Sequence, residues 1–327
     1  MIYPWQQTQW QHLQQRLKEG RLAHALLFTG PSGTGKNHFA QLFAKALLCS
    51  EPTADGSPCG QCSSCTWVNA DSHPDMHTVM LEDDAKAISV NQIRALGHFV
   101  GLKSQQGRYK VILITPADAM NVNAANSLLK TLEEPTESVV IILVTHQVFN
   151  LPATIRSRCQ KVDFPLPAQE MGLAWLSAQL PAAETAQIAL SVAQGAPLDA
   201  LHIAKEEGLS HRQVFFDDLF ALANGEKHPV TIGEKWAKQN IQQYFAWFHS
   251  VLADMIKLNM LDQPQQICHL DYQEAMQNQA RRLNLKQLYQ CYERIGDAQR
   301  LLKANMNPQL LVESLLIPWT EMYKGNN

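Results

Sequence analysis

The chain has 327 residues, of which 46% are hydrophobic and 17% are charged, and its formal net charge at pH 7 is −3. This composition excludes a disordered protein and is sufficient for two or three domains with cores of their own. The slightly acidic balance argues against a protein that holds DNA by its overall charge. The longest apolar runs, such as Val139–Val144, are too short to cross a bilayer, and the first residues lack the pattern of a signal peptide. We therefore expect a cytoplasmic protein without a membrane partner.

The first half of the chain alternates short apolar runs with helical patterns, as repeated strand–helix–strand units require. Runs that are apolar at nearly every position suit strands that are buried on both faces of a sheet. The predicted strands are Ala25–Thr29, Met76–Met80, Lys110–Ile114, Val139–Thr145 and Cys159–Phe164. The sequence thus predicts an α/β domain with a parallel sheet and helices on both faces.

The second half of the chain carries helical patterns and no strand signal. The stiff segment Phe164–Pro167 predicts a domain boundary, so we divide the chain into residues 1–167, 168–208 and 209–327. The middle region is rich in Ala, Leu and Gln and is broken at Gly195-Ala196-Pro197. The last region is predicted to be all-α. Its amphipathic runs are Phe215–Leu222, Trp236–Leu258, Leu283–Leu302 and Leu310–Tyr323.

A phosphate loop follows the first predicted strand. The motif begins at Gly30, continues through Gly33 to Gly35 and Lys36, and is followed by the helical run His38–Leu48. In this context the glycines allow backbone N–H groups to face phosphate oxygens, and Lys36 adds a positive charge. The next residue, Asn37, stands where a Ser or Thr hydroxyl would bind Mg²⁺. The loop therefore predicts at most weak ATP binding, and the alternative is a loop that is retained only as a tight structural turn.

The predicted strand Lys110–Ile114 ends in Thr115-Pro116. In P-loop proteins that hydrolyse nucleotides, carboxylates at this place hold Mg²⁺ and orient a water molecule. Because these carboxylates are absent, we expect no intrinsic ATPase. The chain is predicted to act as a partner within an ATPase assembly.

Four of the seven cysteines fall in one short window with the spacing C-x₉-C-x₂-C-x₂-C. Four thiolates can enclose Zn²⁺ in a tetrahedral shell, and such a closed set leaves no open catalytic position. The predicted ligands of a structural zinc ion are Cys49, Cys59, Cys62 and Cys65. His73 or His77 is the alternative to one of these cysteines, although we favour Cys49. The remaining cysteines, Cys159, Cys268 and Cys291, are expected to be ordinary buried residues.

The segment that precedes the fifth predicted strand contains Arg158. An arginine at the edge of such a domain can reach the γ-phosphate of a nucleotide on a neighbouring subunit and neutralise charge in the transition state. From chemistry alone, a surface arginine in a weak ion pair is the better interpretation.

Taken together, these motifs resemble the AAA+ clamp-loader family of bacterial DNA polymerase III, and within it the delta-prime type of subunit. The resemblance rests on the phosphate loop, the inserted cysteine cluster, the segment Asn126–Pro135 (NSLLKTLEEP) and Ser157-Arg158-Cys159. It implies an AAA+ domain, a small helical lid over 168–208 and an all-α collar over 209–327. The segment Asn307–Leu316 resembles the closing helix of that collar. The resemblance also implies that Arg158 is an arginine finger that acts in trans.

The departures from the family pattern imply which kind of subunit this is. Motor subunits of the family have Asp-Glu in place of Thr115-Pro116, a hydroxyl in place of Asn37, and a lid arginine near Leu198. Thr145 occupies the family's polar sensing position, without the carboxylates that would give it a role. The resemblance implies a non-hydrolytic subunit whose partners are motor subunits of the gamma/tau type and the delta subunit. Through them it would act on the β sliding clamp and primer–template DNA.

Two other interpretations remain open from the sequence. In the first, the chain is an active ATPase motor in which Glu133 or Glu134 replaces the lost acids, although both lie in a predicted helix. In the second, it is a stand-alone zinc-containing protein that binds nucleic acid, which the acidic balance disfavours.

Overall fold

The computed structural model describes residues 1–324 apart from 84, 107–108, 137, 206–207, 262–263, 265 and 305. The chain divides into two compact units, Met1–Met171 and Gly172–Asn327. The division lies close to the predicted boundary at Pro167. The further predicted boundary near 208 adjoins residues 206–207, which lie outside the described residues.

The first unit is built on a five-stranded parallel sheet in the order β2-β3-β4-β1-β5. Its central strands are buried at every position, as the apolar runs in the sequence predicted. The strand predictions are confirmed to within one residue at most ends, although β5 is shorter than expected. The strands are β1 (Ala25–Thr29), β2 (Met76–Met80), β3 (Lys110–Thr115), β4 (Val139–Thr145) and β5 (Gln160–Asp163).

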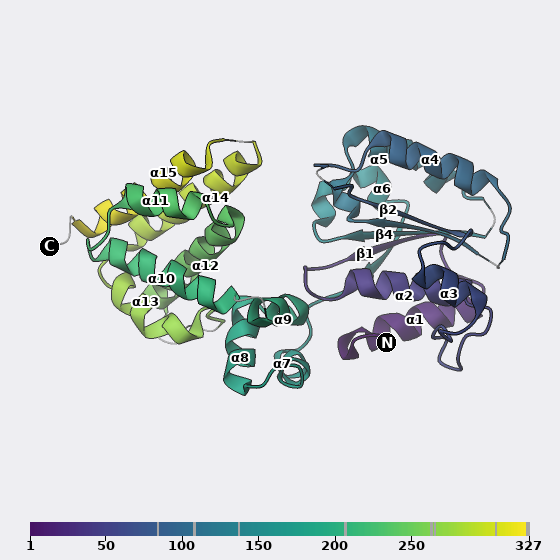
Figure 1. The fold of residues 1–327 in the computed structure, drawn as a ribbon, viewed down its shortest axis with the longest axis horizontal. Coiled ribbons are helices and arrows are strands. Elements are labelled where there is room, and N and C mark those ends of the chain that lie inside the picture. The colour runs from purple at the N-terminus through teal and green to yellow at the C-terminus, as the bar shows by residue number, and fades with distance from the viewer. Residues whose placement is uncertain are drawn as a thin grey trace. The chain divides into compact units, whose positions relative to one another are not determined.

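Helices cover both faces of this sheet (Figure 1). The alternation of side chains along β3 shows the two layers, because Ile112 and Ile114 enter one core while Val111 and Leu113 enter the other. One face is covered by α4 (Val90–Gly101), α5 (Val122–Glu133) and α6 (Ala153–Arg156). The other is covered by α1 (Gln7–Lys18), α2 (Lys36–Leu48) and α3 (Ser63–Asn69). Three short 3₁₀ turns complete the unit: η1 (Pro4–Gln6), η2 (Ala117–Ala119) and η3 (Val148–Asn150).

The described residues of the second unit are helical and include no strand, which confirms the all-α prediction. Helices α7–α9 share a small core, and α10–α15 share a larger one that is centred on buried aromatic residues such as Trp236, Phe248 and Trp319. No described helix has both the length and the apolar character that crossing a membrane requires. The elements are α7 (Gln169–Ser177), α8 (Ala183–Val192), α9 (Pro197–Lys205), α10 (Gly208–Ala223), α11 (Pro229–Ala237), α12 (Ile241–Met260), η4 (Leu270–Tyr272), α13 (Gln273–Ala280), α14 (Leu285–Lys303) and α15 (Pro308–Lys324).

One helix prediction in this unit is wrong. The amphipathic run Trp236–Leu258 forms two helices, because α11 ends at Ala237 and α12 begins at Ile241. The break is stabilised by the side chain of Asn240, which accepts a hydrogen bond from the backbone N–H of Gln243 at 3.2 Å. Such an N-cap satisfies a donor that the new helix would otherwise leave unpaired.

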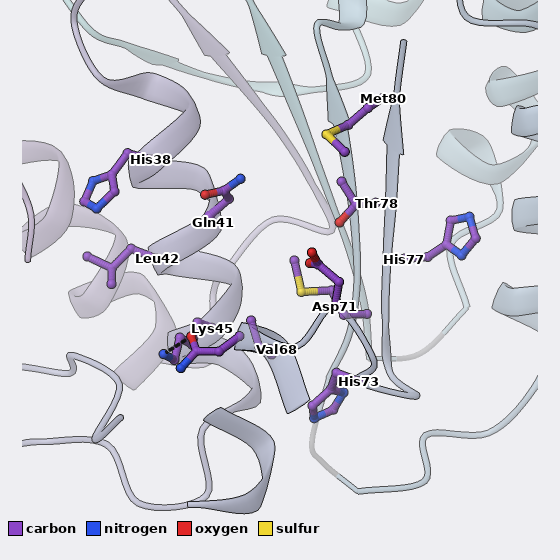
Figure 2. A pocket seen from close by; sticks show the side chains of 12 residues that line it. His38, Gln41, Leu42, Lys45, Val68, Asp71, His73, His77, Thr78 and Met80 are labelled. Atoms are coloured by element: carbon purple, nitrogen blue, oxygen red, sulfur yellow. Dashed lines mark hydrogen bonds between the residues drawn. The ribbon is translucent and has the colours of Figure 1, made fainter. Parts of the chain in front are cut away.

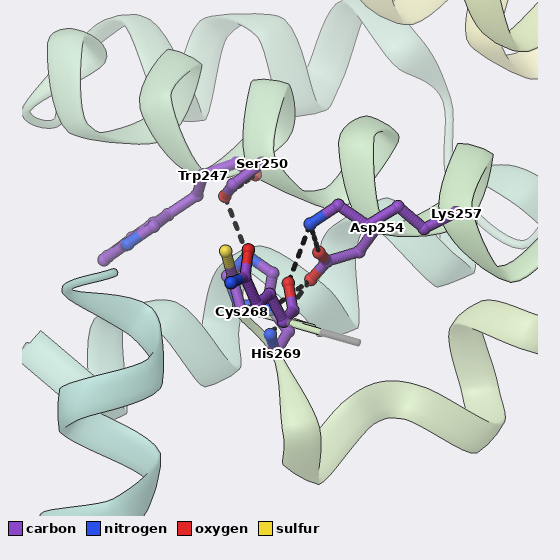
Figure 3. Close-up of polar contacts among 7 residues, drawn as sticks. Trp247, Ser250, Asp254, Lys257, Cys268 and His269 are labelled. Atoms are coloured by element: carbon purple, nitrogen blue, oxygen red, sulfur yellow. Dashed lines mark hydrogen bonds and ion pairs between the residues drawn. The ribbon is translucent and has the colours of Figure 1, made fainter. Parts of the chain in front are cut away.

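A buried polar network fixes the chain segment before η4 to the helices around it (Figure 3). His269 lies 3.0 Å from the Arg212 guanidinium through Nδ1 and 2.8 Å from Ser250 Oγ through Nε2. Asp254 accepts hydrogen bonds from the backbone N–H groups of Cys268 and His269. Burial, together with the charge of Arg212, lowers the pKa of His269 to about 3. The ring is therefore neutral and accepts from Arg212 at Nδ1, which makes the network a structural element of this unit.

Candidate functional site

The phosphate loop connects β1 to α2, and its three predicted glycines have backbone angles that disfavour other residues. Their φ angles are 142° at Gly30, 68° at Gly33 and 84° at Gly35. A Cβ atom on Gly30 would lie 2.1 Å from the carbonyl oxygen of Phe164, so the neighbouring backbone also requires a glycine there. The loop thus keeps the conformational requirements that the sequence motif implied.

Lys36 begins α2 and turns back over the loop. Its side chain is only 2% exposed, and Nζ donates to the carbonyl oxygen of Pro31 at 2.5 Å and to Thr34 Oγ1 at 3.4 Å. The charge that would meet a phosphate group is therefore bonded to oxygen atoms of the loop itself.

The two positions that would hold Mg²⁺ are bonded to each other. The Thr115 hydroxyl at the end of β3 donates to Asn37 Oδ1 at the start of α2, at 2.7 Å. Asp118 lies just beyond β3 and accepts from the Thr145 hydroxyl at 2.6 Å, so this carboxylate, which the sequence analysis overlooked, is bonded elsewhere. Neither Asn37 nor Thr115 offers a carboxylate to a metal ion. The Thr115 hydroxyl and the side-chain oxygen of Asn37 are hydrogen-bonded to each other.

The first residues of the chain cover the loop from outside, and the sequence analysis missed this contact. Trp5 Nε1–H and Gln6 Nε2–H both donate to the carbonyl oxygen of Thr34, each at 2.9 Å. The ring of Tyr3 stacks on that of Trp5 with 5.1 Å between centroids. A Cβ atom on Gly35 would lie 2.6 Å from the Tyr3 ring. The available signal was the pair of aromatic residues around a proline that opens a short helix.

A cleft of about 740 Å³ lies between α2 and β2 (Figure 2). Gln41 and Leu42 line it from the helix, and Thr78 and Met80 line it from the strand. Asp71 is the only acidic side chain among the residues that line it. The sequence analysis considered two of its lining residues, His73 and His77, as alternative zinc ligands, and it predicted no cleft.

The four predicted zinc ligands lie together between α2 and α3. All four sulfur atoms lie within 4.8 Å of one another. The separations from Cys49 Sγ to the sulfurs of Cys59 and Cys62 are 3.6 and 3.8 Å, and that from Cys59 to Cys65 is 4.0 Å. A tetrahedral zinc ion with Zn–S bonds of about 2.3 Å requires sulfur–sulfur separations of about 3.8 Å. The arrangement therefore fits a tetrahedral Zn²⁺ site.

Backbone N–H groups stabilise negative charge within this cluster. The N–H of Cys59 donates to the sulfur of Cys49, that of Cys62 to Cys59, and that of Cys65 to Cys62, at 3.3–3.4 Å. Although burial raises the pKa of Cys62, hydrogen bonds from Ser50 and Cys65 outweigh it and lower that pKa to about 5. Burial raises the pKa of Cys65 to about 12. Since zinc binds thiolates, metal binding at this site would release protons.

The two alternative histidine ligands lie outside the cluster. The ring of His77 contacts Phe99, with centroids 5.5 Å apart, and that of His73 contacts Trp67 at 5.9 Å. Figure 2 shows the His77 side chain directed away from α2. Cys49, and neither histidine, is therefore the fourth member of the cluster.

The remaining cysteines do not all match the expectation that they are buried. Cys291 is buried, but Cys159 and Cys268 are partly exposed. Both of these lie beside a short turn, where the chain is less fully covered than inside a helix of the core.

Arg158 lies between α6 and β5, and its side chain is 36% exposed. Its Nη2 lies 2.6 Å from the carboxylate of Glu133 at the end of α5, and its Nη1 donates to the carbonyl oxygen of Thr154 at 2.9 Å. The guanidinium is thus oriented by two partners but remains accessible. Glu133, which the sequence analysis considered as a replacement catalytic acid, is bonded to this arginine.

Arg158 and the phosphate loop lie at opposite ends of the parallel strands, which we call the amino and the carboxyl edge of the sheet. The loop follows the carboxyl end of β1, whereas Arg158 precedes the amino end of β5, which is parallel to β1. A five-residue strand separates these edges by roughly 16 Å. Arg158 therefore lies too far from its own phosphate loop to contact a phosphate group there.

A parallel sheet in the order β2-β3-β4-β1-β5 with a phosphate loop after β1, followed by a helical unit, defines a P-loop protein of the AAA+ class. In this chain both magnesium-binding positions carry uncharged residues. The family model "DNA polymerase III, delta subunit" matches residues 5–168, and "DNA polymerase III, delta subunit, C terminal" matches residues 206–321.

Curated relatives agree with these matches. The chain is 35% identical to DNA polymerase III subunit delta′ of Pseudomonas aeruginosa over 98% of both chains. It is 27% identical to the delta′ subunit of Escherichia coli over 96% of this chain and 94% of that one. A shorter match covers 46% of this chain and 26% of Bacillus subtilis subunit tau, at 39% identity. The chain belongs to the delta-prime subunit family of bacterial DNA polymerase III.

Proposed function

We propose that this protein is a non-hydrolytic subunit of a clamp loader and that it helps to load the β sliding clamp onto primed DNA. Its direct partners are motor subunits of the gamma/tau type and the delta subunit. Such a subunit supplies no ATP turnover of its own and works in the cytoplasm, where the chromosome is replicated. Arg158 acts in trans, as an arginine finger for ATP that is held by a neighbouring motor subunit.

The position of Arg158 carries this proposal. The side chain is accessible, is oriented by Glu133 and Thr154, and lies at the opposite edge of the sheet from its own phosphate loop. A phosphate group that it contacts therefore does not lie in the phosphate loop of its own chain, as an arginine that acts in trans requires. Neutralisation of charge by such an arginine contributes a rate factor of roughly 10³–10⁵ in phosphoryl transfer.

The bond between Asn37 and Thr115 supports the absence of hydrolysis, because it occupies the two groups at the expected metal position. The interpretation of the chain as an active motor requires Glu133 or Glu134 at this position. Glu133 is instead paired with Arg158 at the other edge of the sheet, which disfavours that interpretation.

We further propose that Cys49, Cys59, Cys62 and Cys65 bind a structural Zn²⁺ ion, which joins the end of α2 to α3. Three sulfur–sulfur separations of 3.6–4.0 Å support this proposal, as does the grouping of all four sulfur atoms within 4.8 Å of one another. A four-thiolate set offers no open coordination position, so the metal would stabilise the fold and would take no part in a reaction.

The decisive experiment is a DNA-stimulated ATPase assay of the reconstituted clamp loader with Arg158→Ala. We expect a fall in turnover of about tenfold, smaller than the factor of roughly 10³–10⁵ given above, because motor sites next to other subunits would still hydrolyse ATP. Arg156→Ala is the matched control, since Arg156 lies two residues before Arg158, at the end of α6, and stacks on the exposed ring of Phe149. Turnover by the Arg158 variant equal to that of the control would contradict the proposal.

A further inference from the structure

The phosphate loop is held in place by contacts at both of its ends. At the first end, Gly30 lies against the backbone of Phe164, whose N–H donates to the carbonyl oxygen of Thr29 at 2.8 Å. At the second end, Gly35 lies against the side chains of Tyr3 and Gln6. The first contact lies directly beyond the paired strands β1 and β5. The second comes from a segment that precedes the sheet and has no place in the strand ladder.

The contacts at the second end converge on one peptide group. The carbonyl oxygen of Thr34 accepts hydrogen bonds from both Trp5 and Gln6. Because a peptide unit is planar, fixing this carbonyl also fixes the direction of the N–H of Gly35. That N–H is one of the loop donors that would otherwise be oriented by a bound phosphate group.

The donor segment is itself rigid. Gln6 is fully buried, and its Oε1 accepts the backbone N–H of Tyr3 at 3.2 Å. The rings of Tyr3 and Trp5 are nearly parallel, with 5° between their planes, and Tyr3 also contacts the ring of His38 on α2. The segment therefore joins the loop to the helix that follows it.

We propose that residues 3–6 form an internal clamp that takes the place of a bound nucleotide in holding the phosphate loop in its native conformation. The loop is then ordered whether or not nucleotide is present. This inference goes beyond the proposed role of Arg158, which lies at the other edge of the sheet and does not depend on it.

Hydrogen–deuterium exchange of the full-length chain tests the clamp at residues 30–36. Trp5→Phe keeps the aromatic ring but removes the Nε1–H donor, and Gln6→Ala removes the second donor. A hydrogen bond with a net contribution of about 1 kcal/mol corresponds to roughly fivefold in local opening, so we expect exchange about 25-fold faster in the double variant. Gln15→Ala is the control, because the side chain of Gln15 is exposed on α1 and donates a hydrogen bond to the carboxylate of Glu19, four residues further along the chain.

The second arm adds Mg²⁺ and ATPγS to the wild-type chain. The clamp predicts that exchange in residues 30–36 changes by less than about twofold, since the loop is already ordered. Trp5→Phe alone provides a milder test if the double variant does not fold. Loop exchange in Trp5→Phe equal to the wild-type rate would overturn the proposal, and so would strong protection of the wild-type loop by ATPγS.

Discussion

In the first unit, the polar side chains of Lys36 and Thr115 at one edge of the parallel sheet are buried, whereas those at the other edge are exposed to solvent. At the carboxyl edge, Lys36 is almost completely buried and is bonded to the loop, and Asn37 is bonded to Thr115. At the amino edge, Arg158 and its partner Glu133 are both substantially exposed. A buried group with satisfied hydrogen bonds gains little from a new ligand, whereas an exposed cation can exchange its partner at low cost.

Under the proposed function, the contribution to catalysis and the binding of nucleotide have separated in this chain. The edge that would bind and hydrolyse nucleotide is satisfied by internal contacts. The edge that faces outward retains a cation suited to phosphate. Substitutions at the two edges should therefore affect different properties: stability at the carboxyl edge and activity of the complex at the amino edge.

Gly30→Ala should have the largest effect on stability. The added Cβ would lie 2.1 Å from the Phe164 carbonyl oxygen, at a φ of 142°. We expect a loss of about 3 kcal/mol or more in the free energy of unfolding, measured with urea. Gly20→Ala is the control, because Gly20 has a φ of 66° but no atom within 4 Å of the new Cβ. Equal losses in the two variants would show that the loop is not tightly fixed.

Cys62→Ser tests whether the carboxyl-edge region also depends on a metal, because α2 connects the phosphate loop to the cysteine cluster. Loss of one thiolate should reduce bound zinc from about one ion per chain to a small fraction and lower the melting temperature by several degrees. Elemental analysis and calorimetry measure the two quantities. Cys268→Ser should change neither, since Cys268 lies in the second unit outside the cluster. A wild-type chain that folds normally without metal would contradict this prediction.

Features that depend on neighbours in the sequence could be predicted well. The strands β1, β3 and β4 follow from continuous apolar runs, and the cysteine spacing indicated all four members of the cluster. The break at Asn240 was missed because the apolar pattern continues through it, and only the capping bond shows that a new helix begins.

Contacts between distant residues could not be predicted from the same patterns. The bond from Trp5 to Thr34 and the ion pair between Glu133 and Arg158 join elements that meet only after the sheet has formed. Periodicity reports which face of an element is buried, but it carries no information about the partner of a particular polar group. The hydrogen bonds between the phosphate loop and other parts of the same chain could therefore be identified only from the structure.

Glu133→Gln sharpens the comparison at the amino edge. Since the pair with Arg158 is half-exposed, its loss should change the free energy of unfolding by less than about 1 kcal/mol. The amide oxygen of glutamine carries no negative charge, so it should hold Arg158 in place less strongly than the carboxylate does. We therefore expect a fall of about two- to fivefold in the ATPase activity of the complex. Glu134→Gln at the adjacent position is the control. A loss as large as that of Arg158→Ala would assign Glu133 a direct role in the reaction.

Lys36→Met should have the smallest effect on activity and tests the carboxyl edge directly. Methionine has a similar length and keeps most of the buried volume, while it removes the ammonium group that would bind phosphate. If the loop of this chain holds no nucleotide during the reaction, DNA-stimulated turnover of the complex should remain within about twofold of wild type. The same assay with Arg158→Ala provides the positive control. A fall in turnover by Lys36→Met that approaches that of Arg158→Ala would mean that nucleotide at this loop contributes to loading, and the separation of the two edges would then be wrong.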